Sequence, residues 1–313
     1  MKLEAHMQTN SILSIVRIAV VTLSVIAARH GHAAAPGDTN AAARVIRAYH
    51  IGNSLTFGAF PNDETAKLFE SRGGRYTRGA HILWGSPLSR IWNNPASNNA
   101  PVAPFGSFSN ALTAFDWDVL TLQPYASTIE GDDGDLRACR RFIELAARRN
   151  PQIQAYVYET WPPRPASNAL MAFAQTWDTP YTGQRTGGLP CREYSEKIVR
   201  LLRAELPKLK KPVLLIPAGD VLYALDALMR AGRVPGFTSV RDLYNDGIHL
   251  NAVGNYAVKC TFYAVLYRRT PVGLPGAAHC PQINDALARV IQETVWKVVC
   301  ANKLTGCGAA SGR

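Results

Sequence analysis

The stretch Val45-Ile46-Arg47-Ala48-Tyr49-His50-Ile51-Gly52-Asn53-Ser54-Leu55-Thr56 decides the fold that this chain is expected to adopt. A largely apolar run ends at a glycine and a polar turn, which is typical of a buried strand that enters a loop. Similar runs predict strands at 75–83, 118–123, 153–160 and 212–216. Helical patterns predict helices at 63–72, 136–149, 192–206, 221–231, 251–267 and 284–302. Strands that alternate with helices favour an α/β fold, a three-layer α/β/α sandwich around a mostly parallel sheet.

Two motifs at opposite ends of this pattern carry reactive side chains. Ser54 follows the first predicted strand, at the kind of strand end where open parallel sheets bind ligands. Far downstream the chain reads Asp246-Gly247-Ile248-His249, followed by Asn251-Ala252-Val253-Gly254. In a turn, a three-residue spacing can put the carboxylate and the imidazole on one side of the backbone. A carboxylate can then hold an imidazole in the tautomer that accepts a proton from a serine hydroxyl.

These two motifs resemble those of the SGNH (GDSL-like) hydrolase superfamily, and the resemblance covers roughly residues 44–270. It implies an SGNH/flavodoxin-like fold, a serine esterase activity through an acyl-enzyme, and no metal or organic cofactor. It implies Ser54 as the nucleophile, His249 as the general base and Asp246 as the residue that orients His249. The metal alternative rests on Asp-x-x-His alone, because no third or fourth ligand accompanies the pair.

The resemblance also implies three hydrogen-bond donors for the oxyanion of the reaction. Two are the backbone N–H groups of Ser54 and of Gly85, the latter in Trp84-Gly85-Ser86 after a predicted strand. The third family block is Gly-x-Asn-Asp, and this chain has Leu122-Gln123-Pro124-Tyr125 instead, as in a divergent subgroup. Gln123 is therefore expected to offer its side-chain amide.

Each of these residues also has an alternative interpretation in which its role is purely structural. Ser54 could cap the following helix, and Asp246 could close an Asx turn in which His249 is a surface residue. Gln123 could bond nearby loop backbone. The segments 93–110 and 161–190 are expected to be long loops, and four tryptophans lie in or beside the loops of the strand-end side. Their rings could stack on sugar rings, line an acyl pocket or anchor the loops in the core: Trp84, Trp92, Trp161 and Trp177.

The organisation of the chain predicts export. Residues 1–35 combine Lys2, an apolar run and Ala33-Ala34-Ala35, which is typical of a cleaved signal peptide, with an uncleaved anchor as the alternative. The protein is thus expected to be secreted or periplasmic, with no membrane span after cleavage. The even count of six cysteines then favours disulfides of undetermined pairing. Residues 271–313 are expected to form a C-terminal extension, ending in a helix, packed on the domain of residues 44–270.

Composition narrows the partners. The 313 residues carry a formal charge of +11, and loss of residues 1–35 leaves +9. No basic run is interleaved with aromatic residues, so nucleic acid is not an expected partner. We expect a small-molecule or polysaccharide ester as substrate, such as a carbohydrate O-acetyl or other short acyl ester. The alternatives are a lipase or acyltransferase of the same superfamily, and a non-catalytic glycan-binding protein on the same scaffold.

Overall fold

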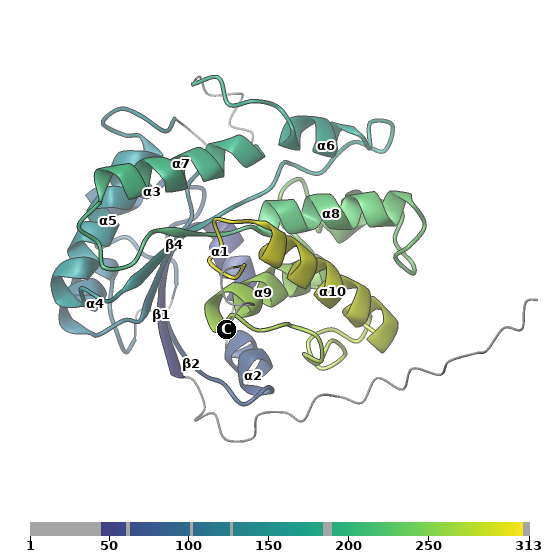
Figure 1. Ribbon diagram of the computed structural model, residues 1–313, viewed down its shortest axis with the longest axis horizontal. Helices are drawn as coiled ribbons and strands as arrows, with labels where there is room; N and C mark the ends of the chain where they lie inside the picture. Colours follow the sequence, from purple (N-terminus) through teal and green to yellow (C-terminus); the bar gives the residue numbers. More distant parts are fainter. Residues whose placement is uncertain (1–44, 61–62, 101–102, 126–127, 184–189, 309–313) are drawn as a thin grey trace, which may run out of the picture. The chain divides into compact units, whose positions relative to one another are not determined.

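The computed structural model describes residues 45–60, 63–100, 103–125, 128–183 and 190–308 (Figure 1). The predicted signal peptide lies outside these residues. The described elements belong to a unit that spans Ala42–Arg313 and is built on one five-stranded sheet of order β2-β1-β3-β4-β5. Every neighbouring pair is parallel. The strands are β1 (Val45–Gly52), β2 (Arg75–Ile82), β3 (Val119–Leu122), β4 (Gln154–Tyr158) and β5 (Leu214–Ile216).

Helices cover both faces of this sheet, as Figure 1 shows, so the predicted α/β/α fold class is confirmed. One layer contains α3 (Leu88–Asn93), α4 (Phe108–Ala114), α5 (Asp135–Arg149) and α7 (Arg192–Glu205). The other contains α1 (Ser54–Ala59), α2 (Glu64–Glu70), α8 (Ala218–Arg230), α9 (Ala252–Tyr267) and α10 (Asp285–Ala301). The short α6 (Ala172–Trp177) packs beside α8.

The alternation of side chains along each strand produces these two cores. On β1, Ile46 and Ala48 are buried with α2, α8 and α9, whereas Tyr49 and Ile51 are buried with α3, α4 and α5. Successive residues of a strand point to opposite faces, so a strand covered on both sides is largely apolar. Because β1 lies between β2 and β3, its carboxyl end is inside the sheet, at the point where the strand order reverses and where open parallel sheets bind ligands.

The segment after α9 contributes to the same core. Leu287, Ile291 and Val295 of α10 are buried with α8 and α9. The buried Gln292 amide donates to the Tyr256 hydroxyl at 2.6 Å and to the Leu274 carbonyl at 2.8 Å. A buried polar group needs such partners, so α10 is locked to α9 by polar as well as apolar contacts.

The expected disulfides are a point on which the structure differs from prediction. All six cysteines are free thiols: Cys139, Cys191, Cys260, Cys280, Cys300 and Cys307. Cys139 and Cys191 lie in one core and Cys260, Cys280 and Cys307 in the other, with the sheet between the two sets. Burial raises the pKa of Cys260 to about 12. The even count was a poor guide because buried cysteines also serve as small apolar core residues.

The predicted long loops are the second difference. Helix α6 lies within the segment 161–190, and α4 begins within 93–110. These helices are six and seven residues long, too short for a clear helical period in the sequence. Among the described residues, no helix has both the length and the apolar character needed to cross a bilayer.

Candidate active site

The turn that carries Ser54 is built by its neighbours. Strand β1 ends at Gly52, where a Cβ atom would lie 2.2 Å from the Thr56 hydroxyl oxygen, so only glycine fits. Asn53 is the N-cap of α1, and its side-chain oxygen accepts a hydrogen bond from the Leu55 N–H at 3.0 Å. Ser54 is the first residue of the helix. The capping role considered for Ser54 thus belongs to Asn53, which leaves the serine hydroxyl free for other contacts.

The Asp246–His249 turn joins the 3-10 helix η1 (Val240–Leu243) to α9. Tyr244 and Leu250 form an antiparallel bridge across its base, and the Asn245 N–H donates to the His249 carbonyl at 2.8 Å. Asn251 caps α9 by accepting the Gly254 N–H at 3.1 Å. The asparagine and glycine of the second motif are therefore parts of a helix start that fixes where the turn ends.

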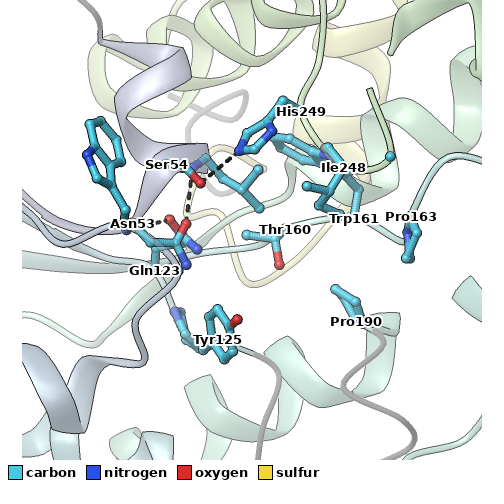
Figure 2. Close-up of a pocket in the computed structure, with 15 residues that line it drawn as sticks. Asn53, Ser54, Gln123, Tyr125, Thr160, Trp161, Pro163, Pro190, Ile248 and His249 are labelled. Atoms are coloured by element: carbon cyan, nitrogen blue, oxygen red, sulfur yellow. Dashed lines mark hydrogen bonds between the residues drawn. The ribbon is translucent and has the colours of Figure 1, made fainter. Parts of the chain in front are cut away.

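The structure brings the serine, histidine and aspartate into one chain of hydrogen bonds (Figure 2). His249 Nε2 lies 2.8 Å from Ser54 Oγ, and His249 Nδ1 lies 2.8 Å from Asp246 Oδ2. The other carboxylate oxygen, Oδ1, accepts the N–H groups of Ile248 at 2.9 Å and His249 at 2.8 Å. Asp246 thus closes an Asx turn and holds the imidazole at the same time.

These bonds keep Asp246 ionised. Hydrogen bonds from the backbone N–H groups of Ile248 and His249, and from the imidazole, lower the pKa of Asp246 to about 2. The pair is nevertheless open to solvent, with 51% of the Asp246 side chain and 41% of the His249 side chain exposed. A carboxylate that accepts from Nδ1 leaves Nε2 as the proton acceptor toward Ser54.

Gln123, the predicted third donor, lines the cavity beside Ser54, and its two polar atoms differ in their contacts. The side-chain oxygen accepts three hydrogen bonds from the start of α1: from Asn53 N at 3.1 Å, Thr56 N at 3.1 Å and Thr56 Oγ1 at 2.7 Å. The alternative in which Gln123 bonds nearby backbone therefore holds for its side-chain oxygen. The amide nitrogen has no hydrogen bond among the described residues, and Gln123 lines the cavity beside Ser54.

The two backbone donors are equally uncommitted. Within the described part of the chain, neither the Ser54 N–H nor the Gly85 N–H makes a hydrogen bond. Gly85 adopts φ +57°, a left-handed conformation that favours glycine, and its added Cβ would meet no atom within 4 Å. All three predicted donors line the same cavity as His249. The arrangement can therefore present free N–H groups to an anionic oxygen beside Ser54.

The cavity has a volume of about 720 Å³, which is within the range of small-molecule sites. Figure 2 shows Tyr125 and Pro190 facing Ser54 across it, with Thr160 between. The sequence did not predict that five further residues would line the cavity: Asn53, Leu55, Thr160, Pro163 and Ile248. Thr160 could have been identified because it lies at the end of a predicted strand. Proline and leucine side chains give no comparable signal in the sequence. The lining residues are Asn53, Ser54, Leu55, Trp84, Gly85, Gln123, Pro124, Tyr125, Thr160, Trp161, Pro163, Pro190, Gly247, Ile248 and His249.

The loop after β4 braces the exposed Asp246–His249 turn. The Trp161 indole N–H donates to the Ile248 carbonyl at 3.0 Å, and the Arg164 N–H donates to the Gly247 carbonyl at 2.8 Å. On the same side, the Tyr244 hydroxyl donates to the Pro162 carbonyl at 2.6 Å. Three bonds between two loops hold the turn in place although its side chains are exposed.

Other titratable groups of this edge face the interior. His50 is fully buried between Thr121 and Tyr76, each 2.6 Å from a ring nitrogen, and burial lowers its pKa to about 3. Burial raises the pKa of Glu159 well above its ordinary value, and this carboxyl accepts the Asp220 N–H at 3.0 Å. Neither residue lines the cavity. Among the described residues, no group of three or more His, Cys, Asp or Glu side chains is placed to hold a metal ion.

Comparisons with known proteins place the fold. No family model matches the chain, and no curated protein matches it. A solved structure of a DUF4886 family protein from Bacteroides uniformis aligns with a TM-score of 0.55 at 18% identity, over 82% of this chain and 95% of that one. This likeness shows a shared fold.

Two other solved structures align with lower scores. A GDSL-like lipase from Parabacteroides merdae, described as putative, aligns with a TM-score of 0.40 at 13% identity, over 72% of this chain and 96% of that one. A family 3 carbohydrate esterase from Clostridium thermocellum aligns with a TM-score of 0.41 at 15% identity, over 70% of this chain and 94% of that one. The parallel sheet of order 2-1-3-4-5 between two helical layers is the flavodoxin-like arrangement expected from the SGNH resemblance.

Proposed function

We propose that this protein is a serine hydrolase that cleaves ester bonds through an acyl-enzyme. The observation that carries the proposal is the continuous hydrogen-bonded series Ser54–His249–Asp246 at the mouth of a cavity. A serine hydroxyl is a weak nucleophile until a base removes its proton, and an oriented imidazole is the usual base. A capping role for Ser54 or a surface role for His249 does not explain these two hydrogen bonds together.

In the proposed reaction, Ser54 Oγ attacks the ester carbonyl while His249 Nε2 takes its proton. Asp246 stabilises the imidazolium and keeps the ring orientation. His249 then gives the proton to the departing alcohol oxygen, which leaves an acyl group on Ser54. A water molecule, deprotonated by the same imidazole, attacks the acyl carbonyl. The imidazole then returns the proton to Ser54 Oγ as the bond from Oγ to the acyl carbon breaks, which releases the acid and restores the serine.

The negative oxygen of each tetrahedral intermediate requires donors that are already in place. The uncommitted N–H groups of Ser54 and Gly85 and the amide nitrogen of Gln123 support this role. Because its own oxygen is bonded to the start of α1, the Gln123 amide cannot flip without losing three hydrogen bonds. Gln123, which has a longer side chain, thus takes the place of the asparagine of the family, and the three hydrogen bonds of its oxygen fix the direction of its amide nitrogen.

The finer parts of the proposal concern substrate and location. We propose a short-chain ester, with a carbohydrate O-acetyl group as the first candidate, and export directed by residues 1–35. Intact-mass measurement of the protein secreted by a suitable bacterial host tests export, because cleavage removes about 35 residues. A secreted protein that retains residues 1–35 would support the anchor instead.

The central experiment is covalent labelling with a fluorophosphonate, which reacts only with an activated serine. The parent protein is expected to gain one adduct at Ser54 and to hydrolyse p-nitrophenyl acetate. Ser54→Ala should lose both properties, whereas Ser109→Ala, at an exposed serine of the opposite helical layer, should keep both. No adduct and no turnover of any short ester in the parent would refute the hydrolase and favour the glycan-binding alternative. Strong preference for long-chain esters would favour a lipase.

A further inference from the structure

Trp84 is an unusual residue on this surface. Among the described residues only Val45, Trp84 and Met171 are large hydrophobic side chains that are exposed, and Trp84 is the only aromatic one. It is 45% exposed, and it alone of the three lines the cavity of Ser54. An exposed aromatic ring at a cavity mouth often marks a contact with a ligand.

The other tryptophans of the loops are used within the protein. Trp161 and Trp177 are fully buried and donate their indole N–H groups to Ile248 and Asp220. Trp92 stacks on Phe108, with ring centroids 5.6 Å apart. The indole N–H of Trp84, by contrast, makes no hydrogen bond within the described ranges. Of the four, Trp84 is the one whose ring and donor are both available.

The backbone and one side of Trp84 are firmly held. Its N–H donates to the Asn99 side chain at 2.9 Å, and its carbonyl accepts the Ser86 hydroxyl at 3.1 Å. The Phe57 ring meets the indole edge-on, with centroids 4.9 Å apart and planes at 90°. Since the ring is positioned before any ligand arrives, little conformational entropy is lost on binding.

The chemistry of the cavity defines what would lie on this ring. None of the described lining residues is Asp, Glu, Lys or Arg. Within the described part of the chain, the hydroxyls of Thr160 and Tyr125 and the amide nitrogen of Asn53 make no hydrogen bond, so they are available to a ligand. The lining thus combines apolar surface with free hydroxyl and amide groups, which suits a ligand that has both an apolar face and hydroxyl groups.

We infer that Trp84 is the stacking platform for a neutral, hydroxylated ring, of the kind found in sugars, in the ester that this site binds. The inference rests on the proposed function, which supplies the ester bond, and it adds the ring that lies beside this bond in the substrate. The ring stacks its C–H face on the exposed indole, and its hydroxyls bond the free hydroxyl and amide groups that line the same cavity.

Binding and turnover test this separately. In a Ser54→Ala background, calorimetric titration with a neutral acetylated xylo-oligosaccharide measures affinity without hydrolysis. Trp84→Ala should weaken binding about 5- to 10-fold, and Trp84→Phe, which keeps a flat ring, should weaken it less. Met171→Ala removes an exposed apolar side chain outside the cavity and should leave affinity unchanged.

With Ser54 intact, kcat/KM is compared for the same oligosaccharide and for methyl acetate, which has no ring. Trp84→Ala should lower the first about 5- to 10-fold through KM and leave the second within about twofold. An equal fall for both esters, or an unchanged oligosaccharide affinity, would overturn the inference. A Trp84→Ala variant that lost activity only toward phenyl acetate, whose ring bears no hydroxyl, would also overturn the inference. A failure of the hydrolase proposal shows instead as a parent protein without a Ser54 adduct, and the titration still decides the role of Trp84.

Discussion

Trp161→Phe should lower the turnover of small esters although Trp161 is no part of the Ser54–His249–Asp246 series. The indole N–H donates to the Ile248 carbonyl at 3.0 Å, in the residue that precedes His249. No other described group donates to that carbonyl. Phenylalanine keeps an aromatic ring in the core and removes the donor, so the turn loses one of its three bonds to the loop after β4.

Two magnitudes follow. An acceptor left without its partner costs about 1 to 3 kcal/mol of stability, and the half-buried Ile248 favours the lower end because water can reach it. The lost hydrogen bond should affect turnover more strongly than it affects stability. A displacement of about 1 Å at a reacting group can cost about 10²-fold in rate, so we expect a 10- to 100-fold fall in kcat for methyl acetate.

Trp177→Phe is the matched control. Trp177 is fully buried, and its indole N–H donates at 3.0 Å to Asp220, far in sequence from the turn and outside the cavity. Both variants should lose similar stability in urea unfolding, but only Trp161→Phe should lose kcat and slow fluorophosphonate labelling of Ser54. Equal kinetics in the two variants would refute the positioning role.

Three further predictions concern individual side chains. Asp246→Asn keeps the shape of the turn but stabilises the wrong imidazole tautomer, so kcat for methyl acetate should fall about 10³- to 10⁴-fold with the far-UV spectrum unchanged; an unaltered kcat would exclude Asp246 from the reaction. Gln123→Glu retains the oxygen that Asn53 and Thr56 bond but removes the amide donor, so kcat should fall about 10²-fold with stability largely kept, and full activity would show that the donor is not needed. The pKa of His50 is about 3 in the fold and near its ordinary 6.5 when unfolded, so the unfolded chain binds the extra proton as pH falls through this window. Stability should therefore drop by up to about 1.4 kcal/mol per pH unit from pH 6.5 downward, and urea unfolding of His50→Gln should show a shallower slope; parallel slopes would contradict the assignment.

Much of the sheet could be predicted because β1 and β3 to β5 are buried on both faces and read as apolar runs. The strand ends then located Ser54 and Gln123, and the spacing of Asp246 and His249 located the turn. These features are local, so a single sequence carries them. The register that puts Gly52 beside Ile82 depends on the pairing of separate strands and was not predicted.

The parts that escaped prediction depend on tertiary contacts. Trp84 and Trp161 both follow strand ends and look alike in sequence, yet one is exposed and the other buried. Gln123 was expected either to offer its amide as a donor or to bond nearby backbone, and the structure shows that its oxygen accepts three hydrogen bonds at the start of α1. Cysteine parity favoured cross-links, but parity does not say which side of a sheet each thiol occupies. No local pattern reports these choices.

The placement of Asp246 and His249 in one four-residue turn has a consequence for partial unfolding. Their mutual bond depends on neighbouring backbone, whereas the contact with Ser54 joins segments 195 residues apart in the sequence. Loosening of the protein would separate nucleophile from base long before it separated base from acid. Enzymatic rate would then vanish early in denaturation, ahead of any spectroscopic change in helix content, and would serve as a sensitive gauge of native architecture.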